Sequence, residues 1–202
     1  MGLAESQALL ARLLVDAALR ERFVADPTGV AAAFGLDAEE ASGLARASAD
    51  QVAWFADSLV RKRRGAVAKC LPLTRRALGG DRFDSLFRRH AAAFIPGGVA
   101  RHRDDAIAFA DLLGRVEDIA TTWLGDLVRL EAASLRASEP VRRWSQCRLR
   151  HRPDAVLRAA LDGADPPPRP CPCLIVWFRT TRRGRLRRLV LAPPRWRPRS
   201  RG

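Results

Sequence analysis

Apolar residues recur at helical spacing along the first two thirds of the chain. Within residues 3–60 they fall three or four positions apart and predict a set of short helices, interrupted at Asp26 and Pro27. A longer helix is predicted from about Glu117 to Arg136, where apolar residues cover much of the helix surface. A helix of that kind is buried, so the pattern predicts a helical protein with a substantial core.

Three charged residues interrupt the apolar run of that longer helix. Asp126 and Arg129 are three positions apart and share one helical face, whereas Glu131 lies on the side of Leu124 and Leu127. A structural ion pair that fixes the helix to a neighbour is one interpretation, because buried charges are normally paired. A catalytic carboxylate is the other, but it would need a nucleophile, metal or base, and the neighbouring sequence supplies none.

The spacing changes after Pro140 and becomes strand-like around residues 144–149. Residues 153–161 predict a short helix with proline in its first turn. The apolar run 173–179 and the segment 185–191, in which leucine and arginine alternate apart from one doubled arginine, flank a five-residue turn and predict a β-hairpin. The expected fold class is therefore mainly α: a multi-helix domain followed by a small C-terminal α+β, winged-helix-like domain with a β-hairpin.

These changes in pattern divide the chain into four predicted segments. They are an N-terminal helical module (1–60), a helical domain (61–140), a basic α+β hairpin domain (141–192) and a disordered basic tail (193–202).

The positive charge lies entirely in the last part of this 202-residue chain. Residues 1–140 hold 19 Lys+Arg and 19 Asp+Glu, whereas residues 141–202 hold 17 arginines against three aspartates. The formal net charge of +14 therefore belongs to the C-terminal segment, which should attract a polyanion or an acidic peptide. The basic cluster Arg61 to Arg64 lies in the part of the chain whose net charge is zero, and a cluster of this kind predicts a solvated helix face.

Residue patterns typical of catalysis are missing. The glycine pairs at 79–80 and 97–98 lack the spacing and the Lys-Ser/Thr of a phosphate-binding loop. His90, His102 and His151 never pair at the spacing of helical metal sites. We therefore expect no enzyme activity and no cofactor in this chain.

The Cys171-Pro172-Cys173 segment is the one candidate for a metal site. A tetrahedral zinc site needs four ligands, and the other two would have to come from Cys147, Cys70 or His151. The alternative, which we favour, is that these are free thiols at a strand edge. The first residues carry no signal-peptide pattern and no apolar run approaches a membrane span, so a cytoplasmic protein is expected.

Four short motifs follow one another in the helical region. They are the basic helix start at Arg61 to Arg64, then Leu71-Pro72, then Leu78-Gly79 followed by Phe83, and finally Leu-x-Asp-x-x-Arg-Leu-Glu from Leu124 to Glu131. In this order they resemble the helical domain of the partner subunits of multinuclear non-heme iron-dependent oxidases, although leucine stands before the proline where that family has an aromatic residue.

The resemblance implies a non-catalytic subunit. Such partners bind the oxidase, which holds the iron, and their C-terminal α/β unit resembles a peptide-recognition element that captures the leader of a ribosomally made precursor peptide. The oxidase then modifies the precursor, often at cysteine. Structural or oxidase-contact roles are implied for Pro72, Asp126, Arg129 and Glu131.

Peptide capture also has a basis in the residues themselves. An extended peptide can pair with the edge of a hairpin through main-chain hydrogen bonds, while arginines select acidic side chains. The predicted peptide-binding residues are Ile175, Trp177, Arg179, Arg185, Arg187 and Arg188. A DNA-binding regulator that uses the basic winged-helix-like domain remains the alternative, because it needs the same positive charge.

Overall fold

The computed structural model describes residues 3–37, 39, 42–43, 49–97, 100–163, 170–181 and 184–192. The chain forms two compact units, one of residues 1–66 with 87–96 and the other of residues 67–86 with 97–202. The fold is mainly helical with a small C-terminal antiparallel sheet, which confirms the expected fold class. The predicted tail, residues 193–202, lies outside the described residues.

The first unit begins with short helices that aspartates cap. Asp16 accepts a hydrogen bond from the Leu19 N–H at 3.0 Å, and Asp26 accepts one from Gly29 at 2.8 Å. These helices enclose a small core of Leu9, Leu13, Leu19, Phe23, Val30, Ala31 and Leu36. Their bounds, with the long helix that follows, are α1 (Leu3–Leu13), α2 (Ala17–Ala25), α3 (Pro27–Ala32) and α5 (Ala49–Cys70).

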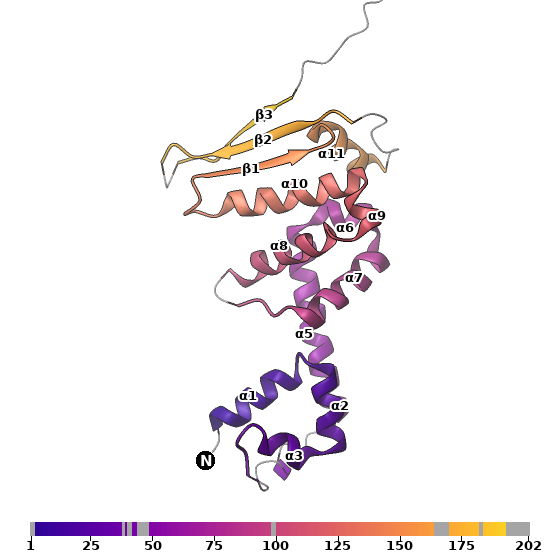
Figure 1. Cartoon of the computed structure of the whole chain (residues 1–202), viewed down its shortest axis with the longest axis vertical. Helices are drawn as coiled ribbons and strands as arrows, with labels where there is room; N and C mark the ends of the chain where they lie inside the picture. The colour runs from indigo at the N-terminus through magenta and orange to yellow at the C-terminus, as the bar shows by residue number, and fades with distance from the viewer. Residues whose placement is uncertain are drawn as a thin grey trace, which may run out of the picture. The chain divides into compact units, whose positions relative to one another are not determined.

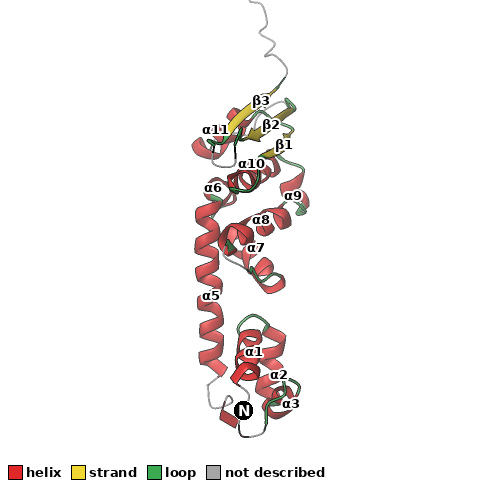
Figure 2. Cartoon of the chain, turned by 90° about the vertical axis from the view of Figure 1, so that its left-hand side faces the viewer, coloured by secondary structure: helices red, strands yellow, loops and turns green. Residues whose placement is uncertain are grey.

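Helix α5 runs without a break past residue 60, where the sequence suggested a segment boundary (Figure 2). The basic cluster lies within this helix and is only partly solvated. Arg61 is exposed, whereas Arg63 is half-buried and donates a hydrogen bond to the Phe94 carbonyl oxygen at 2.8 Å. His90 is buried and its ring stacks on that of Phe94, with the ring centroids 5.1 Å apart.

The second unit contains the remaining helices and the sheet. The helices are α6 (Pro72–Leu78), α7 (Gly80–Ala93, whose last residues belong to the first unit), α8 (Arg101–Leu113), α9 (Glu117–Ala120), α10 (Trp123–Ser138) and α11 (Pro153–Asp162). Gly79 separates α6 from α7 with a φ of 78°, a conformation that favours glycine. Pro153 occupies the first turn of α11, as predicted.

The helix predicted from Glu117 to Arg136 is in fact two helices. The chain leaves α9 at Thr121, becomes extended at Thr122, and enters α10 at Trp123. The Thr122 hydroxyl donates to the Ile119 carbonyl oxygen at 3.0 Å, which closes the turn. Apolar spacing continues across this break, so the pattern identified the buried face correctly but could not locate the interruption.

Three antiparallel strands form the sheet in the order β1-β2-β3: β1 (Trp144–Leu149), β2 (Cys173–Phe178) and β3 (Arg187–Leu191). The predicted hairpin is present as β2 and β3, and β1 pairs with the other side of β2. Strand β2 is therefore central. Figure 1 shows the sheet lying along α10, which covers one of its faces.

Helix α10 and the sheet share one core, so Pro140 does not separate two independently packed parts. The shared core consists of Leu130, Ala133, Ala137, Cys147, Leu149, Cys173, Ile175 and Trp177. A second cluster, in which Leu127 meets Val156 and Ala160, fixes α11 against α10. No described helix is long and apolar enough to cross a membrane.

Candidate functional site

The carboxylate of Asp126 joins α10 to the turn that connects β1 with α11. The side chain is fully buried, and one of its oxygens accepts the backbone N–H groups of Arg150 at 3.0 Å and His151 at 2.9 Å. The Nδ1 atom of His151 lies 2.8 Å from the same oxygen, and Arg129 pairs with the other oxygen. Both oxygens are therefore occupied by contacts within the fold, which supports the structural interpretation of this residue.

Arg129 is less enclosed than the sequence suggested. Its side chain is 37% exposed, although its Nε atom is buried and has no hydrogen-bond partner among the described residues. Water can therefore reach part of the guanidinium group while its other end is bound to Asp126. Loss of Arg129 should cost less than loss of a fully buried partner.

Glu131 caps the N-terminus of α6. Its two carboxylate oxygens accept the backbone N–H groups of Leu73 at 3.1 Å and Thr74 at 2.8 Å, directly after Pro72 at the first helical position. An anion is favoured there because unpaired N–H groups and the helix dipole both point toward it. Burial still outweighs these hydrogen bonds and raises the pKa of Glu131 above its ordinary value.

The implied structural residues therefore meet around α10. Glu131 binds the helix that Pro72 begins, while Asp126 and Arg129 hold the turn after β1. Gly125 belongs to the same arrangement, because a Cβ atom at this position would lie 2.7 Å from the Ile119 carbonyl oxygen. The predicted oxidase contact at these residues stays a prediction; Pro72 is the exposed member of the set.

Two of the predicted peptide-binding residues lie in the core instead of at an edge. Ile175 is fully buried and Trp177 is 5% exposed, and both belong to the central strand, facing α10. Sequence reasoning placed them at a hairpin edge because it paired β2 with β3 alone. Their side chains are enclosed and are not accessible to a peptide.

The predicted arginines divide into one structural residue and three exposed ones. Arg179 donates to the Gly184 carbonyl oxygen at 3.0 Å and to that of Ser138 at 3.3 Å, so it ties the hairpin turn to the end of α10. Arg185, Arg187 and Arg188 are exposed on β3 or just before it. Strand β3 pairs only with β2 among the described strands, so its other edge has no strand beside it.

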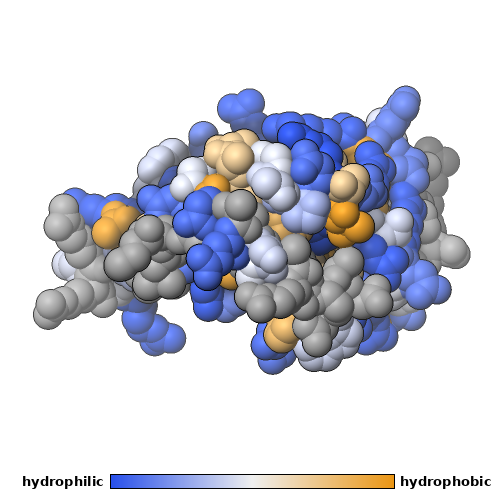
Figure 3. Space-filling view, turned by 90° about the horizontal axis from the view of Figure 1, so that it is seen from below, coloured by the Kyte–Doolittle hydropathy of each residue, from blue (hydrophilic) through white to orange (hydrophobic). Residues whose placement is uncertain are grey.

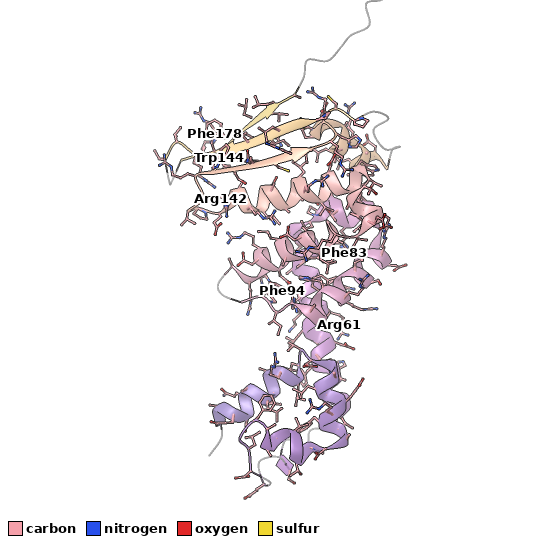
Figure 4. All side chains as sticks on the ribbon, viewed as in Figure 1. Arg61, Phe83, Phe94, Arg142, Trp144 and Phe178 are labelled. Carbon is pink, nitrogen blue, oxygen red and sulfur yellow. The ribbon has the colours of Figure 1, made fainter. Side chains whose placement is uncertain are left out.

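The outer face of the sheet, defined here as the side away from α10, is a surface that sequence reasoning missed. The strand register places its residues in three rows: Trp144, Phe178 and Arg187; then Gln146, Val176 and Leu189; then Arg148, Leu174 and Leu191. Figure 4 shows Trp144 and Phe178 close together near one end of the sheet. The uninterrupted apolar run of β2 carries the signal, because such runs are typical of strands covered on both faces.

The cysteines show no arrangement that favours a metal. Burial raises the pKa of Cys147 to about 11 and also raises that of Cys173, which makes both thiols poor nucleophiles. Within the described residues, no cluster of three or more His, Cys, Asp or Glu side chains could hold a metal ion.

Residues 35–115 match the family model described as SCO6045-like, C-terminal domain. The match covers less than half of the chain and ends before α10 and the sheet. A search of curated proteins found no match.

Proposed function

We propose that this chain is a non-catalytic partner subunit of a multinuclear non-heme iron-dependent oxidase, and that it recruits the leader of a ribosomally made precursor peptide. The oxidase and the precursor come from the resemblance of residues 61–136 to such partner subunits. The iron, the oxidation and its usual cysteine target belong to the oxidase in this proposal. The complex would act in the cytoplasm.

The observation that carries the peptide-binding part is the basic edge of the sheet. Strand β3 has one edge without a strand beside it among the described residues, and it carries exposed Arg187 and Arg188, with Arg185 just before it. An extended peptide that pairs with this edge would gain main-chain hydrogen bonds. The arginines would favour a peptide with acidic side chains, because charge-assisted hydrogen bonds to carboxylates are stronger than neutral ones.

Co-purification tests the proposal directly. The full chain is expressed with an oxidase of this family and with a short candidate precursor that has an acidic leader, and complexes are separated by size-exclusion chromatography at moderate salt. A stable complex with both is expected. If the chain is folded and binds neither protein, the proposal is wrong.

Charge reversal tests the predicted edge. Replacing Arg185, Arg187 and Arg188 by Glu should weaken binding of the leader about tenfold or more and leave oxidase binding unchanged. Reversal of the exposed Arg75 and Arg76 on α6 changes the net charge in the same direction outside the sheet and serves as the control. Equal losses in both variants would mean that net charge alone, and not the β3 edge, attracts the peptide.

Measuring the affinity for duplex DNA at increasing salt concentrations distinguishes the alternative function, a DNA-binding regulator, from the proposed one. A DNA-binding regulator should bind with a steep salt dependence and a clear preference for one sequence. Weak binding that does not depend on the DNA sequence would reflect only the net charge of +14.

A further inference from the structure

The outer face of the sheet combines exposed apolar side chains with a simple charge pattern. Trp144, Leu189 and Leu191 are 55%, 49% and 50% exposed. Between them lie the half-buried side chains of the central strand β2, which are Leu174, Val176 and Phe178. Strands β1, β2 and β3 contain no acidic residue. Contiguous apolar surface of this kind on a small unit typically marks an interaction site.

The register arranges these side chains along a diagonal. Trp144 begins the first row, Val176 is the middle of the second, and Leu191 ends the third. Arg187 and Arg148 occupy the two remaining corners. The face therefore presents an apolar band with one arginine on each side of it, near opposite ends.

The dimensions of this band suit one α-helix. The two outer strands are separated by two strand spacings, about 10 Å, which equals the diameter of a helix. The first and third rows are four residues apart, about 14 Å along the strand, so the diagonal is about 17 Å long. A helix of about 11 residues, or three turns, covers that length.

The opposite face of the same sheet shows how a helix fits it. There α10 packs Leu130, Ala133 and Ala137 onto side chains of β1 and β2. These three residues are spaced i, i+3 and i+7, which is the apolar stripe of an amphipathic helix. A sheet with apolar side chains on both faces is usually covered on both, and helices are a common cover.

We infer that the outer face of the sheet binds a three-turn amphipathic helix, carried by a partner polypeptide, with acidic residues on both flanks of its apolar stripe. The acidic residues would pair with Arg148 and Arg187. The inference goes beyond the proposed function, because it holds for any partner that carries such a helix. A chain that binds no oxidase could still bind this helix.

Charge disfavours two other occupants. A second copy docked through the same face would bring the same arginines together, and the three strands offer no acidic residue opposite them. The C-terminal segment 193–202 carries four arginines and no acidic residue, so it would be repelled as well. An acidic partner gains from the arginines that disfavour both of these occupants.

Selection from a random 18-residue peptide display library on the immobilised full chain tests the inference. Enriched peptides should carry apolar residues at i, i+3, i+4 and i+7 with Asp or Glu on both flanks, and should become helical by circular dichroism when bound. A parallel selection on the immobilised Leu189→Glu chain is the control. The inference is overturned if the wild-type chain enriches no such pattern relative to this control, or if the enriched peptides bind in an extended conformation.

Matched variants locate the binding site. Leu189→Glu should weaken the selected peptides about tenfold or more, whereas Leu161→Glu on α11, where the leucine is 48% exposed, should change their affinity less than about twofold. Equal effects of the two variants would overturn the inference. If Leu189→Glu does not fold, Leu191→Gln replaces it in both the selection and this comparison.

A charge swap tests the two corner arginines. The chain with both Arg148→Glu and Arg187→Glu should prefer peptides whose acidic flanks are replaced by lysine, and should bind the original peptides about tenfold less tightly. Retention of the preference for acidic flanks in the doubly substituted chain would overturn the assignment of these corners.

Discussion

Replacing Asp126 by alanine should destabilise the second unit by about 3–5 kcal/mol, because the backbone N–H groups of Arg150 and His151 would lose the acceptor that holds the turn. The carboxylate is fully buried and accepts the N–H groups of Arg150 and His151, with the imidazole of His151 2.8 Å away. Each buried donor left without an acceptor costs about 1–3 kcal/mol. Arg129 adds little, because its side chain is 37% exposed and water can replace the carboxylate.

Urea unfolding followed by circular dichroism measures this effect. A loss of about 3–5 kcal/mol corresponds to a fall in melting temperature of roughly 10 °C for a chain of this size. Asp126→Asn should be intermediate, because the amide oxygen can accept one hydrogen bond while its NH2 group faces the same donors. The control is Asp111→Ala, which removes an ion pair with Arg136 from a side chain that is 53% exposed, and should cost less than about 1 kcal/mol.

The result that would refute this reasoning is a similar, small loss in the Asp126→Ala and Asp111→Ala chains. It would mean that the turn after β1 does not depend on the buried carboxylate. A large loss in both chains would instead mean that burial does not distinguish the two aspartates, and would contradict the reasoning equally.

Three further predictions follow from the same unit. Gly125→Ala should destabilise the chain by several kcal/mol, because its Cβ would lie 2.7 Å from the Ile119 carbonyl oxygen. Gly65→Ala in α5, where a Cβ would meet no atom within 4 Å other than nearby backbone of its own helix, should stabilise the chain by roughly 0.5–1 kcal/mol in thermal unfolding. Similar effects of the two substitutions would contradict the close approach at Gly125. Because burial raises the pKa of Glu131 above its ordinary 4.5, its contribution to the free energy of unfolding should be largest below pH 4.5 and fall as pH rises through the raised pKa. Urea unfolding of the wild-type and Glu131→Gln chains at a series of pH values gives the difference in their free energies of unfolding. This difference should fall as pH rises, and an increase would contradict the prediction. With its pKa raised to about 11, roughly one part in a thousand of the Cys147 thiol is ionised at pH 8. A thiol reagent should therefore modify Cys147 only after unfolding, which peptide mapping can show. Rapid labelling of Cys147 in the folded chain would contradict its burial.

The mainly helical fold and the C-terminal hairpin could be predicted because their signals are local. The apolar spacing of α10, the apolar run of β2 and the mixed arginine and leucine pattern of β3 each lie within a few turns or residues of chain. The structural role of Asp126 could be predicted only in part. Its pairing with Arg129 follows from helical spacing, but its contacts with Arg150 and His151 join residues more than 20 positions apart.

The candidate surfaces depended on strand pairing, which the sequence did not specify. A hairpin of β2 and β3 alone would expose one edge of each strand and both faces of β2. Pairing of β1 with β2 made β2 central, enclosed Ile175 and Trp177 beneath α10, and left β3 as an edge. The same pairing created the outer face and set the rows that place Arg148 and Arg187 at its corners.

By itself, the sequence determined the helical class, the hairpin, the confinement of positive charge to residues 141–202, and the presence of charges inside a buried helix. These properties depend on composition and on short-range periodicity. The tertiary structure decided what the buried charges bind, since Glu131 finds its donors on α6 and Asp126 finds its donors after β1. It also decided which apolar side chains remain exposed, because that depends on which strands and helices pack together and not on the spacing within any one of them.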